Sequence, residues 1–114
     1  MSDYVFSKEI DEIMSIGFWL KDAVGVNEWA FTKDEAISVV TQLKELNIPV
    51  LGGDVYEIRE GRPHPIGENW SCNQEHDEPF TQFVERSASK ATDYLTRYPT
   101  TAPDSHKFVV VPGV

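Results

Sequence analysis

Residues 50–59 read VLGGDVYEIR, a run in which strand-favouring residues predominate. Glu57 interrupts the apolar residues as a solvent-facing position of a strand would. Gly52 and Gly53 are followed by no helix start and no Lys-Ser/Thr pair, so they do not read as a phosphate-binding loop. Two glycines inside a strand more often mark a bulge or the close approach of another segment, here a helix expected at residues 79–98. The run predicts a long, locally irregular strand.

The chain is predicted to turn back at residues 60–62, Glu-Gly-Arg, a sequence suited to a hairpin. A return strand is expected over residues 64–72. Because Pro63 and Pro65 cannot donate to a ladder, this strand suits only the edge of a sheet. Residues 108–111 read Phe-Val-Val-Val and are apolar on both faces, so we expect that strand in the middle of the sheet.

Two helices are predicted in the first half of the chain. Ser7 can cap a short helix that ends before Gly17, which stands where a C′ glycine belongs. Thr32 is followed three residues later by Glu35, and this pair forms a capping box. Apolar residues then recur at helical spacing until Pro49 stops the helix.

The third helix has the clearest signal. Glu78 and Pro79 open it, because a carboxylate suits the helix dipole and proline suits the first turn. Arg97 lies near its C-terminal end, where positive charge is favourable. One apolar stripe follows the helical period: Phe80, Phe83, Val84, Ser87, Ala91, Tyr94, Leu95 and Tyr98.

These elements predict an α+β fold, in which a small, mainly antiparallel sheet of three to four strands carries three helices on one face. A short extended piece within residues 26–31 would precede the second helix. The 114 residues are enough for one core and too few for two, so residues 1–114 are expected to form a single domain.

Composition restricts the environment of the protein. The chain is 40% hydrophobic and 25% charged, which is ordinary for a globular domain. No apolar run approaches the roughly 18 residues of a membrane span, and the first ten residues contain no apolar core of a signal peptide. One cysteine, Cys72, cannot form an internal disulfide. A cytoplasmic protein with no membrane partner is expected.

The chain is strongly acidic, with a net charge of −9 from 10 Lys and Arg against 19 Asp and Glu. Nucleic-acid binding requires cationic contacts, so a nucleic-acid partner is not expected. Acidity can simply maintain solubility, or it can attract a basic protein partner. Composition leaves both readings open.

Much of the charge lies between Asp54 and Glu85, a span with eight acids, two bases and a net charge of −6. The polar residues 71–78 form a loop of the kind that often carries function. The plainer alternatives are that these acids complement a helix N-terminus and that a tryptophan beside them belongs to the core. We predict a partner-binding surface made of Asp54, Glu57, Glu68, Trp70, Glu75, Asp77 and Glu78.

Catalysis and metal binding find little support. Cys72, His76 and Asp77 lie within six residues of one another, with His64 nearby, but no second half of a zinc site has recognisable spacing. Acidic neighbours disfavour the thiolate of Cys72, and no nucleophile elbow is present. No enzymatic activity, metal or cofactor is expected. Two alternatives stay open: a small metal-dependent enzyme using these residues, and an adaptor that binds a peptide by strand addition at a sheet edge.

Four segments together resemble the immunity protein 40 family of bacterial polymorphic toxin systems. They are residues 47–56 (NIPVLGGDVY), 68–72 (ENWSC), 94–99 and 108–111. The stretch Ile-Pro-x-Leu-Gly-Gly-Asp-Val is the most specific, and the likeness extends from about residue 10 to residue 111.

The resemblance implies a cytoplasmic antitoxin that binds a cognate toxin domain and blocks it. It brings no catalytic residues to this chain. Asp54 and Trp70 match the recurring motif of the family, yet such a motif can maintain the fold while the contact residues differ from one toxin to another. The predicted interface therefore depends on charge.

Overall fold

The computed structural model describes residues 4–102 and 104–113, so the outermost ends of the predicted single domain lie outside the described residues. Within these ranges the chain forms one sheet of five strands and four helices. The helices are α1 (Lys8–Met14), α2 (Lys21–Val24), α3 (Lys33–Glu45) and α4 (Phe80–Arg97). The strands are β1 (Phe18–Trp19), β2 (Trp29–Phe31), β3 (Val50–Arg59), β4 (Arg62–Ser71) and β5 (His106–Pro112).

The sheet has the order β1-β2-β5-β3-β4, and every neighbouring pair is antiparallel. The α+β class and the antiparallel sheet are confirmed, with β5 in the centre and β4 at one edge. The predicted number of elements was too low: β1 and α2 were missed, because two residues and one helical turn carry no readable periodicity. None of the helices in the described part of the chain is long and apolar enough for a membrane span.

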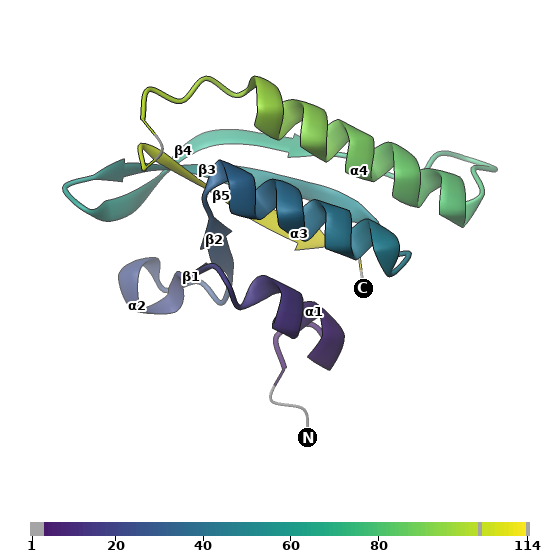
Figure 1. Cartoon of the computed structure of the whole chain (residues 1–114), viewed down its shortest axis with the longest axis horizontal. Helices are drawn as coiled ribbons and strands as arrows, with labels where there is room; N and C mark the ends of the chain where they lie inside the picture. The colour runs from purple at the N-terminus through teal and green to yellow at the C-terminus, as the bar shows by residue number, and fades with distance from the viewer. Residues whose placement is uncertain (1–3, 103, 114) are drawn as a thin grey trace.

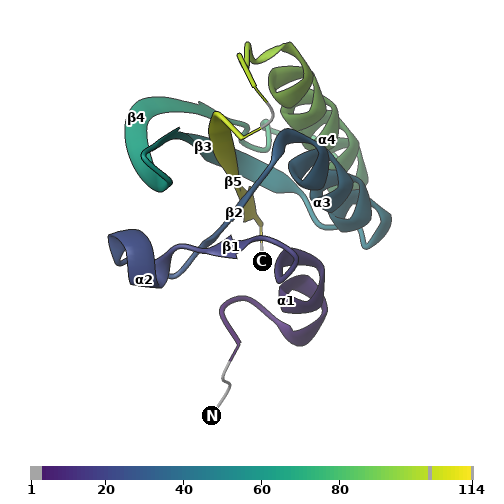
Figure 2. The ribbon, with the colours of Figure 1, turned by 60° about the vertical axis from the view of Figure 1, so that its left-hand side comes forward.

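The helices do not all lie on one face. α3 and α4 run side by side across one face of the sheet, and α1 packs at the end of α3 (Figures 1 and 2). Side chains alternate along β3, so Val55 joins the core under α3 and α4 while Tyr56 joins a smaller cluster on the other face. Leu20, the residue before α2, belongs to that second cluster, and α2 itself contacts β4. α2 therefore partly covers the face that was expected to be bare.

Local signals explain most of the element boundaries. The capping box is present: the backbone N–H of Thr32 donates to Glu35 Oε1 at 2.9 Å, and that of Glu35 donates to Thr32 Oγ1 at 3.2 Å. At the hairpin tip, Glu60 and Gly61 have φ of 52° and 77°, the left-handed values that a two-residue turn requires. Gly17 differs from its prediction, since α1 ends on Ser15 in right-handed conformation. A Cβ on Gly17 would instead come 2.6 Å from the ring of Phe31, so this glycine provides space.

β3 is irregular at two places: its register shifts against β5 between Val50 and Gly52, and against β4 between Asp54 and Tyr56. The segment that approaches closely is Trp70 on β4, not α4 as predicted. A Cβ on Gly53 would lie 2.2 Å from the indole ring of Trp70 and 2.1 Å from the carbonyl oxygen of Val109. The second glycine of the pair therefore makes room for a tryptophan in the core.

The outer side of β4 is closed to backbone pairing along much of its length. Ile58, opposite Pro63, donates its N–H to Ser105 and away from β4, so the proline nitrogens fall on the open side, where they have no hydrogen to donate. Further along, Lys90 Nζ donates to the backbone oxygen of Ser71 at 2.5 Å. Prolines and a lysine are typical means of protecting an edge strand.

Candidate interaction surface

The loop between β4 and α4, residues 72–79, is organised around Arg86 of α4. The guanidinium group holds Glu78 with two bonds: Nε donates to Oε2 at 2.7 Å and Nη2 donates to Oε1 at 2.8 Å. Nη2 also donates to the backbone oxygen of Asn73 at 2.6 Å, and Nη1 lies 3.2 Å from Cys72 Sγ. One side chain thus contacts both ends of the loop.

Glu78 completes this arrangement from inside the loop. Its Oε1 accepts a hydrogen bond of 3.0 Å from the backbone N–H of Glu75, and its carbonyl oxygen accepts one of 2.8 Å from Gln74 Nε2. Asp77 adopts a left-handed conformation with φ of 63°, which closes the turn. These contacts give the loop a defined shape.

The ionisation of Glu78 reflects these contacts. The hydrogen bond from Arg86, followed by the one from the backbone of Glu75, lowers the pKa of Glu78 to about 2. The same hydrogen bond raises the pKa of Arg86 further above its ordinary value. Because the Glu78 side chain is only 5% exposed, this predicted partner-binding acid has a structural role inside the loop.

The outer surface of the loop carries charge that faces solvent. The side chains of Glu75 and Asp77 are 72% and 87% exposed, and Glu85 on the first turns of α4 is exposed as well. Phe80 was predicted as part of the buried stripe of α4, yet it is 46% exposed and adjoins this loop. An exposed aromatic ring beside acidic groups suits contact with a basic protein surface.

Asp54 lies away from this loop, on the sheet face that α2 partly covers, where it is exposed. Its charge acts on Glu28, an acid that no sequence pattern singled out. Burial and the charge of Asp54, in that order, raise the pKa of Glu28. Burial raises the pKa of Tyr56 too, with smaller contributions from Glu28 and Asp54. The sheet face that α2 partly covers therefore carries a second group of acids, Glu28 and Asp54, separate from those of the loop.

Glu57 and Glu68 each have a partner within the chain. Arg59 Nε donates to Glu57 Oε1 at 2.5 Å, and this bond is the main cause that lowers the pKa of Glu57. Glu68 Oε2 accepts a hydrogen bond of 2.5 Å from the Tyr98 hydroxyl. Burial, and then this bond, raise the pKa of Tyr98. Both acids lie outside the loop.

Trp70 lies in the core. It is 7% exposed, and its ring stacks on Tyr94 with 4.7 Å between centroids. Its Nε1 has no hydrogen-bond partner among the described residues. Trp70 therefore lies where the alternative interpretation placed it, in the core, and the surface proposed below does not include it.

The seven predicted residues thus do not form one continuous patch. Only Glu75, Asp77 and Glu78 come together, in the loop, and the third of them is turned inward. Sequence reasoning did not identify Arg86, whose guanidinium group contacts Cys72, Asn73 and Glu78 of this loop. Its contacts reach 13 and 14 residues back along the chain, beyond any helical spacing.

The residues of the alternative metal site are not brought together. Cys72 is buried, whereas the His76 side chain is 96% exposed. His64 pairs with Glu57 in the part of β4 near the hairpin tip. Among residues 4–102 and 104–113, no three His, Cys, Asp or Glu side chains are placed to hold a metal ion.

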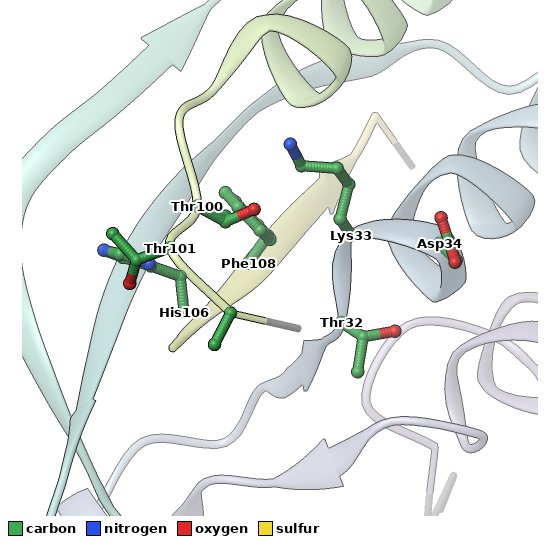
Figure 3. Close-up of a pocket in the computed structure, with 8 residues that line it drawn as sticks. Thr32, Lys33, Asp34, Thr100, Thr101, His106 and Phe108 are labelled. Carbon is green, nitrogen blue, oxygen red and sulfur yellow. The ribbon is translucent and has the colours of Figure 1, made fainter. Parts of the chain in front are cut away.

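A cavity of about 500 Å³ lies between the start of α3 and the loop that follows α4 (Figure 3). Figure 3 shows His106 on one side of it and Asp34 on the other, turned away, so these two groups do not form an acid–base pair. Lys33 Nζ is occupied by the backbone oxygen of Tyr98 at 2.7 Å. His106 Nδ1 lies 2.8 Å from Ser105 Oγ. The described residues that line the cavity therefore do not converge as the groups of a catalytic site do.

Comparison with protein families identifies the family to which this chain is similar. The sequence model of one family, described as Immunity protein 40, matches residues 20–112. Neither the curated proteins nor the solved structures gave a match. The family match begins at the start of α2 and extends through β5. It therefore includes the loop held by Arg86 and four of the five strands, and leaves out β1. The chain belongs to the immunity protein 40 family.

Proposed function

We propose that this chain is a cytoplasmic immunity protein that binds a cognate toxin domain and blocks it. The observation that carries the proposal is the family match over residues 20–112. The net charge of −9 supports a basic partner surface, because opposite charges steer association and favour correct docking. Such a partner would include a nuclease-like toxin, whose substrate groove must be positively charged.

The surface that best suits this role combines the exposed Glu75 and Asp77 of the loop with the exposed Phe80 and Glu85 from the first turns of α4. We name these residues the acidic loop surface. A basic partner would place its cations against the carboxylates and its aliphatic or aromatic groups against the ring of Phe80. Asp54, Glu57 and Glu68 would add longer-range attraction from neighbouring faces. Glu78 and Trp70 would support the surface from beneath.

Inhibition would then be by occlusion. A rigid acidic projection that covers a basic groove denies the substrate both space and electrostatic attraction, and it requires no bond to be made or broken. This mechanism needs neither a nucleophile nor a metal in the immunity protein.

Strand addition, the mode expected of a peptide adaptor, is a less suitable alternative. A partner strand would need successive free N–H and C=O groups along the outer side of β4. Pro63 and Pro65 supply no N–H there, and Lys90 already occupies the oxygen of Ser71. Recognition through side chains is therefore the favoured mode.

The test needs the cognate toxin domain, which is to be sought among the genes next to that of this chain, and binding is measured by surface plasmon resonance. We expect the double variant E75K/D77K to associate at least about tenfold more slowly, and with a weaker dependence on salt, than the original protein. Both side chains are exposed, so the core should be unaffected. Because Asp77 has a left-handed conformation, hydrogen exchange of the Glu78 amide, which donates to the backbone oxygen of Glu75, checks that the loop keeps its shape.

The matched control is D22K/E60K, which makes the same change in net charge at exposed positions on α2 and at the hairpin tip. It should retain most of the association rate. Equal losses in the two variants would mean that only overall charge matters, and the acidic loop surface would be discarded. If the unmodified chain fails to bind the toxin domain or to protect cells that express it, the proposed function itself is wrong.

A further inference from the structure

Arg86 lies next to the acidic loop surface, and the function proposed above does not explain its contacts. It projects from α4 over the ring of Phe83, with 5.6 Å between Cζ and the ring centroid. The side chain is 35% exposed, so it is only partly open to solvent. Its donors are directed at Cys72, Asn73 and Glu78. A cation placed beside a surface meant for a basic partner is unfavourable unless it has another role.

The contacts of Arg86 indicate that role. Glu78 is held by a bidentate pair, the strongest and most directional contact available to arginine. Glu78 in turn accepts from the backbone of Glu75, so the position of Glu75 depends on Arg86 through one intermediate residue. Glu75 Oε1 lies 3.9 Å from Arg86 Nη1, too far for a hydrogen bond and close enough for its direction to be influenced.

We infer that Arg86 is a positioning residue for partner binding, which fixes residues 72–78 in the shape that presents Glu75 and Asp77. This inference rests on the proposed function. A loop that is ordered before binding loses less conformational entropy when the partner docks, so its affinity is higher than that of a mobile loop with the same charges. Arg86 acts through the loop, and its own charge works against a basic partner.

Because the charge of Arg86 opposes a basic partner, the two possible roles predict changes in affinity of opposite sign when Arg86 is substituted. Arg86→Gln removes a positive charge, so a purely electrostatic surface would attract a basic partner more strongly and bind it faster. If Arg86 positions the loop, the same substitution weakens binding. Arg97→Gln is the matched control, because it makes the same charge change on α4 at a side chain that is 81% exposed and forms an ion pair with Asp93, one turn away.

The experiment combines two measurements on each variant. Hydrogen exchange of the Glu75 and Glu78 amides reports the order of the loop, since their N–H groups are bonded within it. Surface plasmon resonance with the cognate toxin domain reports affinity. For R86Q we expect exchange at both amides to rise, and Kd to rise by about tenfold, as for lost charge-assisted bonds that order a loop. R97Q should change neither quantity.

Arg86→Lys provides a second variant in case R86Q folds poorly. Lysine retains the charge but cannot form the planar fork, so it should reproduce the loss of loop order and of affinity in weaker form. Unchanged or tighter toxin binding by R86Q and R86K, with the loop loosened, would overturn the inference and leave the proposed function in place. Failure of the unmodified chain to bind would overturn both.

Discussion

The hydroxyl of Ser87 accepts a hydrogen bond of 3.0 Å from the backbone N–H of Val50 and donates one of 3.0 Å to the carbonyl of Val84. Ser87 is fully buried and belongs to the stripe of α4 that faces the sheet. The two bonds attach the first residue of β3 to the middle of α4. A polar group within the apolar stripe thus fixes the relative position of two elements far apart in the sequence.

Substitution of Ser87 by alanine should destabilise the fold. The N–H of Val50 would lose its partner in a region without access to water, which costs about 1–3 kcal/mol. The measurement is urea denaturation followed by tryptophan fluorescence. Ser89→Ala serves as the control, since Ser89 is exposed on the same helix and its loss should change stability by less than about 0.5 kcal/mol. Equal stability of the two variants would mean that the bond to Val50 contributes nothing.

Alanine at Gly53 should be destabilising as well. The added methyl group would meet both the ring of Trp70 and the backbone of Val109, and the backbone cannot yield. We expect a loss of about 1–3 kcal/mol, the usual range for overpacking a core. Thermal melts can be compared with those of Ser71→Ala, an exposed position on the adjacent strand. If G53A melted like S71A, Gly53 would not be required for space.

Removal of the charge on Glu28 should stabilise the protein at neutral pH. A raised pKa means that the folded state binds the proton more tightly than the unfolded state, so the stability contribution of Glu28 falls as pH rises through its folded pKa. At pH 7 the ionised group is unfavourable, and Glu28→Gln relieves it. The gain over the original protein should shrink as pH is lowered towards 4. A variant that is less stable at pH 7 would contradict this assignment.

For the Glu78–Arg86 pair we expect the opposite dependence: its contribution to the free energy of unfolding should be lost as pH falls. Since the pKa of Glu78 is lowered to about 2, its contribution is complete above its ordinary value of 4.5 and is lost as pH falls through about 2. Glu78→Gln should therefore be less stable than the original at pH 7, and the two curves should converge near pH 2. Circular dichroism melts across this range provide the measurement. A constant difference at every pH would assign the effect to shape instead of charge.

Local sequence patterns predicted the elements that have strong local causes. The capping box at Thr32 placed the start of α3, and Glu60-Gly61 placed the hairpin between β3 and β4. The run of apolar residues in β5 correctly placed it at the centre of the sheet. In each case the deciding interaction lies within a few residues of the signal. β1 and α2 depend on tertiary contacts, and no local sequence pattern predicts them.

The candidate site was predicted only in part for the same physical reason. Acidic composition pointed to a loop in which the structure shows Glu75 and Asp77 to be exposed, and partner binding there stays a prediction. Composition could not distinguish them from Glu78, because the difference is made by Arg86 on the next helix. Trp70 looked like a surface anchor beside charged residues, yet strand alternation and the space above Gly53 place it inside. Such outcomes depend on which residues meet after folding.

The closed edge of β4 has a consequence for how this kind of protein could diversify. Where a partner cannot attach to main-chain groups, it must read side chains, and exposed side chains can be exchanged with little effect on stability. A change of target would then require a few substitutions on the outside of the 72–79 loop, with Arg86 and Glu78 still holding its contour. The fold and the loop's internal contacts would stay the same while the exposed residues that contact the partner are substituted.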